Sequence, residues 1–226
     1  WRAVVICDRM SDMIGDLNSC SFTVTTVTDV ERNHVYTELD GSGLITRHRK
    51  SDVYFKGHNK LMVDSKGDGG HQTVRYDGYT LSIYSYTENN YITVDAPDST
   101  IAMIYEINAR YGVEFPAADF FNPYFTDDLI ETMSSLQLSG RSFVAGQPTY
   151  HIVARNDDMN VEIWISDDSL MLPVKMRISY LSRENAPRHE ITLTDWKLNP
   201  DLPLAMFDFD PPPNGRKISA GVISSN

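Results

Sequence analysis

The feature that most constrains the fold is a long succession of short runs in which polar and apolar residues alternate. The segment 76–97, YDGYTLSIYSYTENNYITVDAP, shows the pattern, with five tyrosines and no charged residue between Asp77 and Glu88. Alternation with a period of two, in residues such as Thr, Val and Tyr, is typical of half-buried β-strands. A chain with many such runs must build most of its core from β-sheet.

Runs of this kind predict about twelve strands in two sets. The first set is predicted at 20–32, 34–47, 51–57, 59–66, 71–77, 79–87 and 90–95, and the second at 136–145, 149–156, 160–166, 172–183 and 188–198. Turn residues separate the strands, as in GDGG at 67–70 and TENN at 87–90, because Gly, Asn and Asp adopt the backbone angles of hairpin turns. We therefore expect strands that follow one another in sequence to pair as antiparallel neighbours.

Two regions change to the period of a helix. Apolar residues lie three or four apart in 3–17 with aspartates opposite them, which predicts an amphipathic helix. In the second region, 97–134, Asp98 or Ser99 caps a predicted helix that ends at Gly112. Two shorter helical segments are predicted after it, at 116–121 and 126–134. The predicted apolar face of the helix beginning near Ser99 consists of Ile101, Ile104, Tyr105, Asn108 and Tyr111.

The predicted fold class is α+β and mainly β. A sheet of about twelve strands must curl, so we expect a strongly curved antiparallel sheet that forms a half-open barrel. Its inner face needs a cover, and the N-terminal helix and the helical insertion are the segments available. We expect one domain over 1–226, with a helix at 1–17, a first strand set at 20–95, a helical lid at 97–134, a second strand set at 136–198 and a closing proline-rich tail at 199–226.

Composition excludes several classes of protein. The net charge is −11 and the longest basic cluster is RHRK at 47–50, which argues against a nucleic-acid partner. No run approaches the roughly 18 apolar residues of a membrane span, so we predict no transmembrane segment. The chain begins at Trp1, and we expect a mature or trimmed product from which any secretory signal has been removed.

Residues that could carry catalysis or bind a metal are scattered. The six histidines form no HExxH pattern, and Cys7 and Cys20 lack the paired spacing of a zinc site. The two cysteines are either buried thiols, which we favour, or a disulfide. Asp64, Ser65 and His71 are close in sequence but flank a hairpin turn, where such groups meet water. We therefore predict no metal, no cofactor and no enzymatic activity.

The pairs of adjacent aspartates at 127–128, 157–158 and 167–168 are also explained without catalysis. Aspartate is a common turn residue because its carboxylate accepts hydrogen bonds from the backbone two residues on. Adjacent side chains at a strand end also point apart, so they form a poor acid and base pair.

A cavity that binds apolar molecules needs only shape, an apolar lining and a cover. Burial of an acyl chain contributes about 0.8 kcal/mol per CH₂, without any ionic partner. We chose candidate lining residues by strand parity and helix face. They are Leu44, Phe55, Leu61, Val63, Leu81, Ile83, Ile101, Ile104, Tyr105, Phe120, Phe121, Ile152, Ile163 and Met176.

Three stretches resemble a known family. They are VRYDGYTLSIYSYTENNYITVDAP at 74–97, VEIWISDDSLMLPVKMRISY at 161–180 and ITLTDWKLNPDLPLAMFDFDPPPNGRKI at 191–218. The chain is similar to the LolA/LolB-like superfamily of lipoprotein carriers, and more closely to its uncharacterised branch of predicted periplasmic proteins of unknown function. The helix-to-strand opening at 9–22 and the segment 109–121 extend the resemblance over nearly the whole chain.

The resemblance implies a half-open barrel around a helical lid, located in the periplasm, that holds an acyl chain or another lipid-like group. The partner would be a hydrophobic small molecule or an acylated protein. The alternative is an envelope interaction or stress-sensor module that binds a polypeptide, using an open sheet edge or the tyrosine-rich surface.

Overall fold

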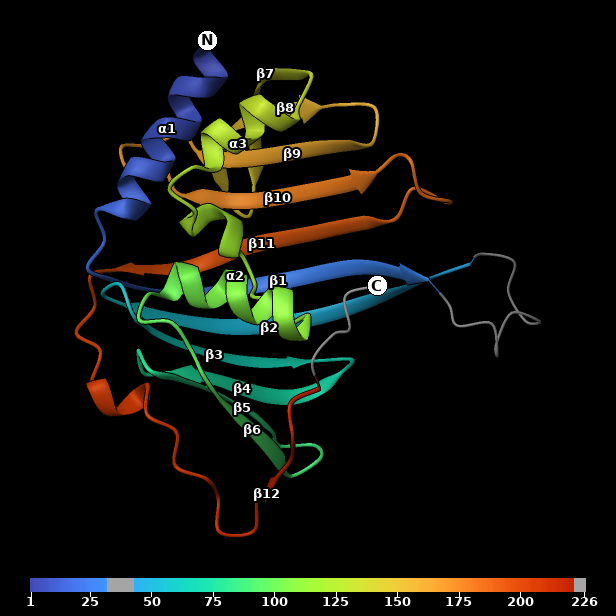
Figure 1. The fold of residues 1–226 in the computed structure, drawn as a ribbon. Coiled ribbons are helices and arrows are strands. Elements are labelled where there is room, and N and C mark those ends of the chain that lie inside the picture. The colour runs from blue at the N-terminus through green and yellow to red at the C-terminus, as the bar shows by residue number, and fades with distance from the viewer. Residues whose placement is uncertain (32–42, 222–226) are drawn as a thin grey trace. The chain divides into compact units, whose positions relative to one another are not determined.

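The computed structural model describes residues 1–31 and 43–221 (Figure 1). Its helices are α1 (Arg2–Gly15), α2 (Thr100–Tyr111) and α3 (Phe125–Thr132), with short 3₁₀ turns η2 (Ala118–Phe121) and η3 (Leu204–Met206). The strands are β1 (Ser19–Glu31), β2 (Leu44–Lys56), β3 (Lys60–Gly67), β4 (Gly70–Tyr76), β5 (Thr80–Ser85), β6 (Asn90–Asp95), β7 (Ser135–Val144), β8 (Gln147–Arg155), β9 (Met159–Ser166), β10 (Pro173–Tyr180), β11 (Arg188–Leu198) and β12 (Arg216–Lys217). No helix in the described part of the chain has the length and apolar character needed to cross a membrane.

The strand predictions hold closely, with two differences among the described residues. The predicted break at 48–50 does not exist, because β2 runs through it as one strand whose charged side chains face water. The predicted strand at 34–47 lies partly outside the described residues. The prediction also missed β12, a two-residue strand that pairs parallel with β6.

The strand order departs from a simple meander at one point. Strands β2 to β6 and strands β7 to β11 each follow sequence order, and β1 stands between β2 and β11 in the hydrogen-bonded order. The first strand therefore lies beside the last long strand, a pairing that local patterns do not reveal.

The chain forms two compact units, each made of three segments. Unit 1 contains 1–16, 25–49 and 119–194, and unit 2 contains 17–24, 50–118 and 195–226, apart from the residues that are not described. Strands β1, β2 and β11 contribute residues to both units. The expectation of a single domain stays a prediction.

The core of unit 1 lies between helices and one face of the strands β7 to β11. Strand register aligns Ile152, Ile163, Met176 and Ile191 in one row across β8, β9, β10 and β11, and all four side chains are buried. Helices α1 and α3 contact each other and β7, as Figure 1 shows for the dark-blue and yellow-green helices beside β7. The side chains that α1 buries are Ala3, Ile6, Cys7, Met10 and Ile14.

The opposite face of the unit 1 strands carries a cross-strand network of charges. Arg177 is paired with Glu162 at 3.2 Å and with Glu190 at 2.8 Å, and Lys175 is paired with Glu190 at 2.8 Å. Burial alone would raise the pKa of Glu190, but hydrogen bonds from Lys175 and Arg177 outweigh it and lower this pKa overall. Each charge has an opposite partner, so the network stabilises strand register rather than forming a charged binding site.

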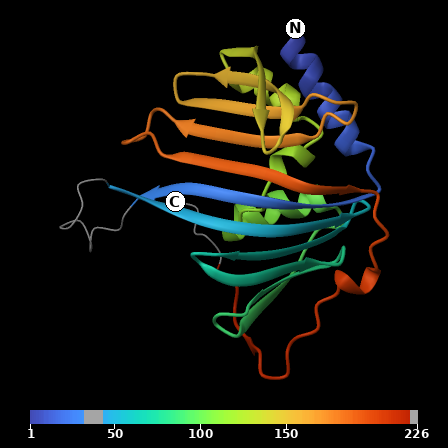
Figure 2. The same ribbon diagram turned by 180° about the vertical axis from the view of Figure 1, so that it is seen from behind.

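The core of unit 2 includes side chains of β3 to β6, antiparallel strands that Figure 2 shows from behind. One register row contains Leu61, Tyr76, Leu81 and Val94, and the next contains Val63, Val74, Ile83 and Ile92. Tyr76 is fully buried, and its hydroxyl donates a hydrogen bond to the carbonyl of Pro97. That bond satisfies the one polar atom of an otherwise apolar side chain.

The remaining tyrosines of 84–91 lie on the other face of these strands. The ring of Tyr86 stacks on His71 with centroids 4.0 Å apart and contacts Tyr84 edge to face at 4.7 Å. Phe209 adds a ring that lies 5.3 Å from Tyr91. This aromatic cluster (His71, Tyr84, Tyr86, Tyr91 and Phe209) holds part of the C-terminal segment against the sheet.

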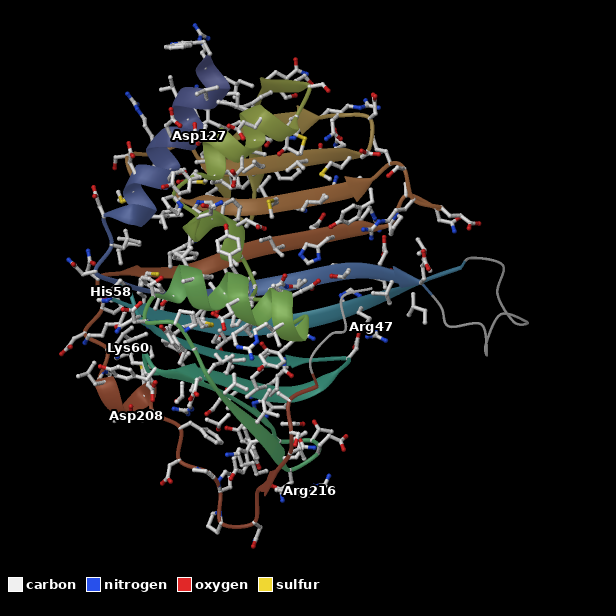
Figure 3. The ribbon with its side chains drawn as sticks, in the orientation of Figure 1. Arg47, His58, Lys60, Asp127, Asp208 and Arg216 are labelled. Carbon is white, nitrogen blue, oxygen red and sulfur yellow. The ribbon has the colours of Figure 1, made fainter. Side chains whose placement is uncertain are left out.

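Further contacts fix the C-terminal segment 199–218 to unit 2. Arg75 donates to the carbonyl of Met206, the backbone N–H of Ile218 donates to the carbonyl of Tyr91, and Phe207 is fully buried. Figure 3 labels Asp208 and Arg216 on this segment, on either side of its turn. This part of the proline-rich tail is therefore packed within unit 2, and its role in closing the domain stays a prediction.

The buried face of α2 differs from the predicted one. The helix buries Thr100, Met103 and Ile107, whereas Tyr105 is 56% exposed. Ile101 and Ile104 are only half-buried. The prediction chose the face with the most apolar and aromatic residues, and it counted a tyrosine that points to solvent.

Both cysteines are free, buried thiols, which confirms the favoured alternative. Burial raises the pKa of Cys7 to about 12, with the charge of Asp8 adding to the effect, and burial raises the pKa of Cys20 to about 12. The folded state therefore disfavours both thiolates relative to the unfolded chain.

We expect this burial to make stability fall at high pH. The raised pKa values contribute stability that is fully present below about pH 9 and is lost as the pH rises toward about 12, because the unfolded chain releases these protons first. Urea titrations between pH 8 and 11 on the protein and on a Cys7→Ala/Cys20→Ala variant would measure this. An equal fall in both proteins would contradict it. At pH 8, iodoacetamide should label the thiols only after unfolding.

Candidate functional site

Unit 1 contains a pocket between the last turns of α1 and the η2 turn. Its volume is about 220 Å³. The lining residues are Ser11, Asp12, Ile14, Gly15, Asp16, Phe120, Phe121, Asn122 and Pro123.

The apolar wall of the pocket comes from Ile14, Phe120 and Phe121. Ile14 and Phe120 are buried, and Phe121 is half-buried. The ring of Phe120 also packs against Phe125 at the start of α3, with centroids 5.5 Å apart. Phe125 thus fixes the ring of Phe120, while the half-buried ring of Phe121 exposes more surface to a ligand.

Asn122 shapes the turn that presents these rings. Its backbone N–H donates to the carbonyl of Asp119 at 3.1 Å, and its side-chain oxygen accepts from the backbone N–H of Tyr124 at 3.0 Å. The side-chain nitrogen donates to Asp128 at 2.6 Å. These bonds stop the 3₁₀ turn and begin α3, which explains how a short loop keeps two phenylalanines in place.

Besides Asn122, three polar side chains line the pocket, together with Gly15 and Pro123. The Ser11 hydroxyl is buried and has no hydrogen-bond partner among residues 1–31 and 43–221. Asp12 and Asp16 are exposed and lie one helical turn apart at the end of α1. The last turn of α1 has no basic residue, so this helix end, which already carries partial negative charge, gains two carboxylates.

The size of the pocket limits what it can hold. Pockets for drug-sized ligands have volumes of about 300–1,000 Å³. A volume of about 220 Å³ admits only a small group or the end of one chain.

The structure brings together two of the fourteen predicted lining residues at this pocket, Phe120 and Phe121. Leu61, Val63, Leu81 and Ile83 share one face of the unit 2 strands, and Ile152, Ile163 and Met176 form the unit 1 row. Leu44 and Phe55 are half-buried on β2. A ligand-lining function for these residues stays a prediction, as it does for Ile101, Ile104 and Tyr105.

The sequence analysis did not identify the pocket residues of α1, because it assigned this helix only to covering the inner face of the sheet. One signal was present: Ser11 lies four residues after Cys7 and three before Ile14, at the margin of the apolar face. A small polar residue at that margin is a place where a helix can leave space beside a neighbouring ring.

Other groups considered from the sequence do not form a catalytic site. Asp64 and His71 are paired at 2.6 Å, but Ser65 lies on the opposite face and shares a 2.7 Å hydrogen bond with Ser51. Asp168 accepts hydrogen bonds from the backbone of the turn after β9. Among the described residues, no group of three or more His, Cys, Asp or Glu side chains could hold a metal ion.

Solved structures of similar fold exist. The chain is similar to an uncharacterised conserved protein from Thermus thermophilus, with a TM-score of 0.54 and 13% identity over 96% of this chain and 99% of that one. It is also similar to the lipoprotein LppX of Mycobacterium tuberculosis, with a TM-score of 0.50 and 12% identity over 90% of this chain and 98% of that one. The predicted fold class, mainly β with helices, is confirmed.

Sequence comparison gives one family. No curated protein sequence matches the chain. The family model described as "Predicted periplasmic protein (DUF2092)" matches residues 3–220.

Proposed function

The chain belongs to the DUF2092 family of predicted periplasmic proteins, and from that premise we propose that it is a periplasmic binding or carrier protein for a hydrophobic ligand. The ligand would be an acyl chain, a lipid or the acylated end of a lipoprotein. The role is non-catalytic. The resemblance to a branch of predicted periplasmic proteins, drawn from the sequence, is confirmed by the family match.

The observation that supports this proposal most is the pocket between α1 and η2. Its rings are held by the turn around Asn122, so the apolar wall exists before any ligand arrives. A preformed pocket with an apolar wall binds a chain end without the cost of ordering that wall. The rest of a longer ligand would lie outside this pocket.

The similarity of fold to LppX gives the proposal general support. LppX is a lipoprotein, so this fold occurs in at least one lipoprotein. The proposal for the present chain does not depend on the ligand of that protein.

The first test is a substitution in the half-buried wall of the pocket. We expect Phe121→Ala to weaken binding of decyl maltoside, an uncharged single-chain amphiphile, about five- to tenfold, because part of a buried ring contact is lost. Isothermal titration below the micelle concentration would measure the dissociation constant. The matched control is Phe143→Ala, which removes a ring that is 72% exposed on the β7 hairpin of the same unit.

Equal affinities of the Phe121→Ala variant and the parent protein would exclude this pocket as the binding site. Mass spectrometry of organic extracts from the purified protein gives an independent result, since a carrier should retain fatty-acid or phospholipid material. Protein that is repeatedly free of lipid and retains a defined polypeptide would favour the alternative function. The edge of β6 fits that alternative, because in the described part of the chain β12 pairs with only Asn90 and Tyr91.

A further inference from the structure

We propose that the pocket of unit 1 selects single-chain amphiphiles by the charge of the head group, taking cationic ammonium heads most tightly and anionic heads most weakly. This inference rests on the proposed function, because it specifies the ligand of the same site. It follows from the charges at the pocket mouth, the volume of the pocket and one unpaired hydroxyl.

The charged side chains of the lining all have the same sign. Asp12 and Asp16 are the only charged residues among the nine that line the pocket, and both are exposed. A chain end that enters among Phe120 and Phe121 leaves its head group near these carboxylates, since a pocket of about 220 Å³ holds little more than the chain end. An ammonium group there gains attraction, and a sulfate or carboxylate meets repulsion.

The end of α1 strengthens this preference. The C-terminus of a helix carries the negative end of its dipole, which a cation stabilises. Natural sequences often place Lys, Arg or His in the last turn, but α1 has none there. The cation that this helix end lacks would come from the ligand.

The Ser11 hydroxyl is a second, independent observation. Ser11 is one of the lining residues and is itself half-buried, and its hydroxyl oxygen is buried without a partner among the described residues. A hydroxyl both donates and accepts hydrogen bonds, so a polar atom at the junction of chain and head group would satisfy it.

The test compares three probes with the same chain: decyltrimethylammonium, decyl maltoside and decyl sulfate. At low ionic strength we expect the ammonium probe to bind about tenfold more tightly than the sulfate, with the maltoside between them. The Asp12→Asn/Asp16→Asn variant should bring the ammonium-to-sulfate ratio close to one, and its maltoside affinity is the reference against which both charged probes are compared. Salt at about 0.5 M should reduce the ratio in the parent protein, because exposed charges are screened.

The matched control is Asp157→Asn/Glu184→Gln, which removes two exposed carboxylates elsewhere in unit 1 and so produces the same net charge. This variant should keep the full ratio. A ratio that falls equally in both variants would show that net charge alone selects the ligand and would overturn the inference. Equal binding of all three probes to the parent protein would overturn the inference and leave the proposed function standing, whereas no binding of any probe would overturn both.

Discussion

Replacing Ile163 by alanine is expected to lower the free energy of unfolding by about 2–5 kcal/mol. Ile163 has no exposed surface, and its register neighbours are Ile152 on β8 and Met176 on β10. Truncation removes three carbon atoms from a packed row, and the neighbouring strands are too constrained to close the space. We therefore expect Ile163→Ala to lower the free energy of unfolding by as much as other truncations in a packed core.

Chemical denaturation followed by circular dichroism would measure this change, and Ile163→Val is the matched control. The smaller truncation should cost about 0.5–1.5 kcal/mol. The result also distinguishes between Ile163 as a core residue and Ile163 as a residue that lines a ligand cavity. If Ile163→Ala changed stability by less than the valine variant and instead weakened decyl maltoside binding, Ile163 would line a space for ligand, as the sequence suggested.

The second large effect is expected at the C-terminal segment. Phe207→Ala should lower the free energy of unfolding by about 3–5 kcal/mol, because a fully buried aromatic ring is lost. Phe207 also anchors the segment next to the point where Arg75 binds the carbonyl of Met206. Its loss should release this segment before the rest of unit 2 unfolds.

Limited proteolysis combined with denaturation would show both consequences. The first cleavage in the Phe207→Ala variant should fall within 199–218. Leu204→Ala is the control, since Leu204 lies in the same segment and is 60% exposed, and surface substitutions usually change stability by about 0.5 kcal/mol or less. A similar loss of stability in both variants would mean that Phe207 is not an anchor.

Strand positions and strand faces could be predicted because alternation along a strand is a local property. Leu61, Val63 and Leu81 were assigned to one face, and the register of β3, β4 and β5 places them there. A shift of one residue would have reversed every such assignment. The hairpin turns prevented it, because their Gly, Asn and Asp residues fix where each strand ends.

Long-range neighbours could not be predicted in the same way. Thr28 on β1 and His189 on β11 share a 2.9 Å hydrogen bond although 161 residues separate them. No local pattern encodes this pairing, because it depends on how two strand sets come together. The parallel pairing of β12 with β6 escaped prediction for a further reason, since two residues are too few to show a period.

Two of the nine residues that line the pocket were named from the sequence. Phe120 and Phe121 were among the candidate lining residues, but Ser11 and Ile14 were not, because helix periodicity identifies a buried face and not the gaps along it. The choice of face for α2 failed for a related reason: Tyr105 is long and amphipathic, so it can lie against water at little cost.

The two buried thiols have a consequence for a protein of the periplasm, where oxidants act on exposed cysteines. Disulfide formation begins when a thiolate reaches its partner sulfur. A buried thiol with a pKa of about 12 stays protonated at neutral pH and is out of reach of other thiols and oxidants. Once folded, the protein keeps both cysteines as reduced thiols in an oxidising compartment, although no disulfide bond joins them. Its redox state is then set by how fast it folds after export, since only the unfolded chain is open to cross-linking.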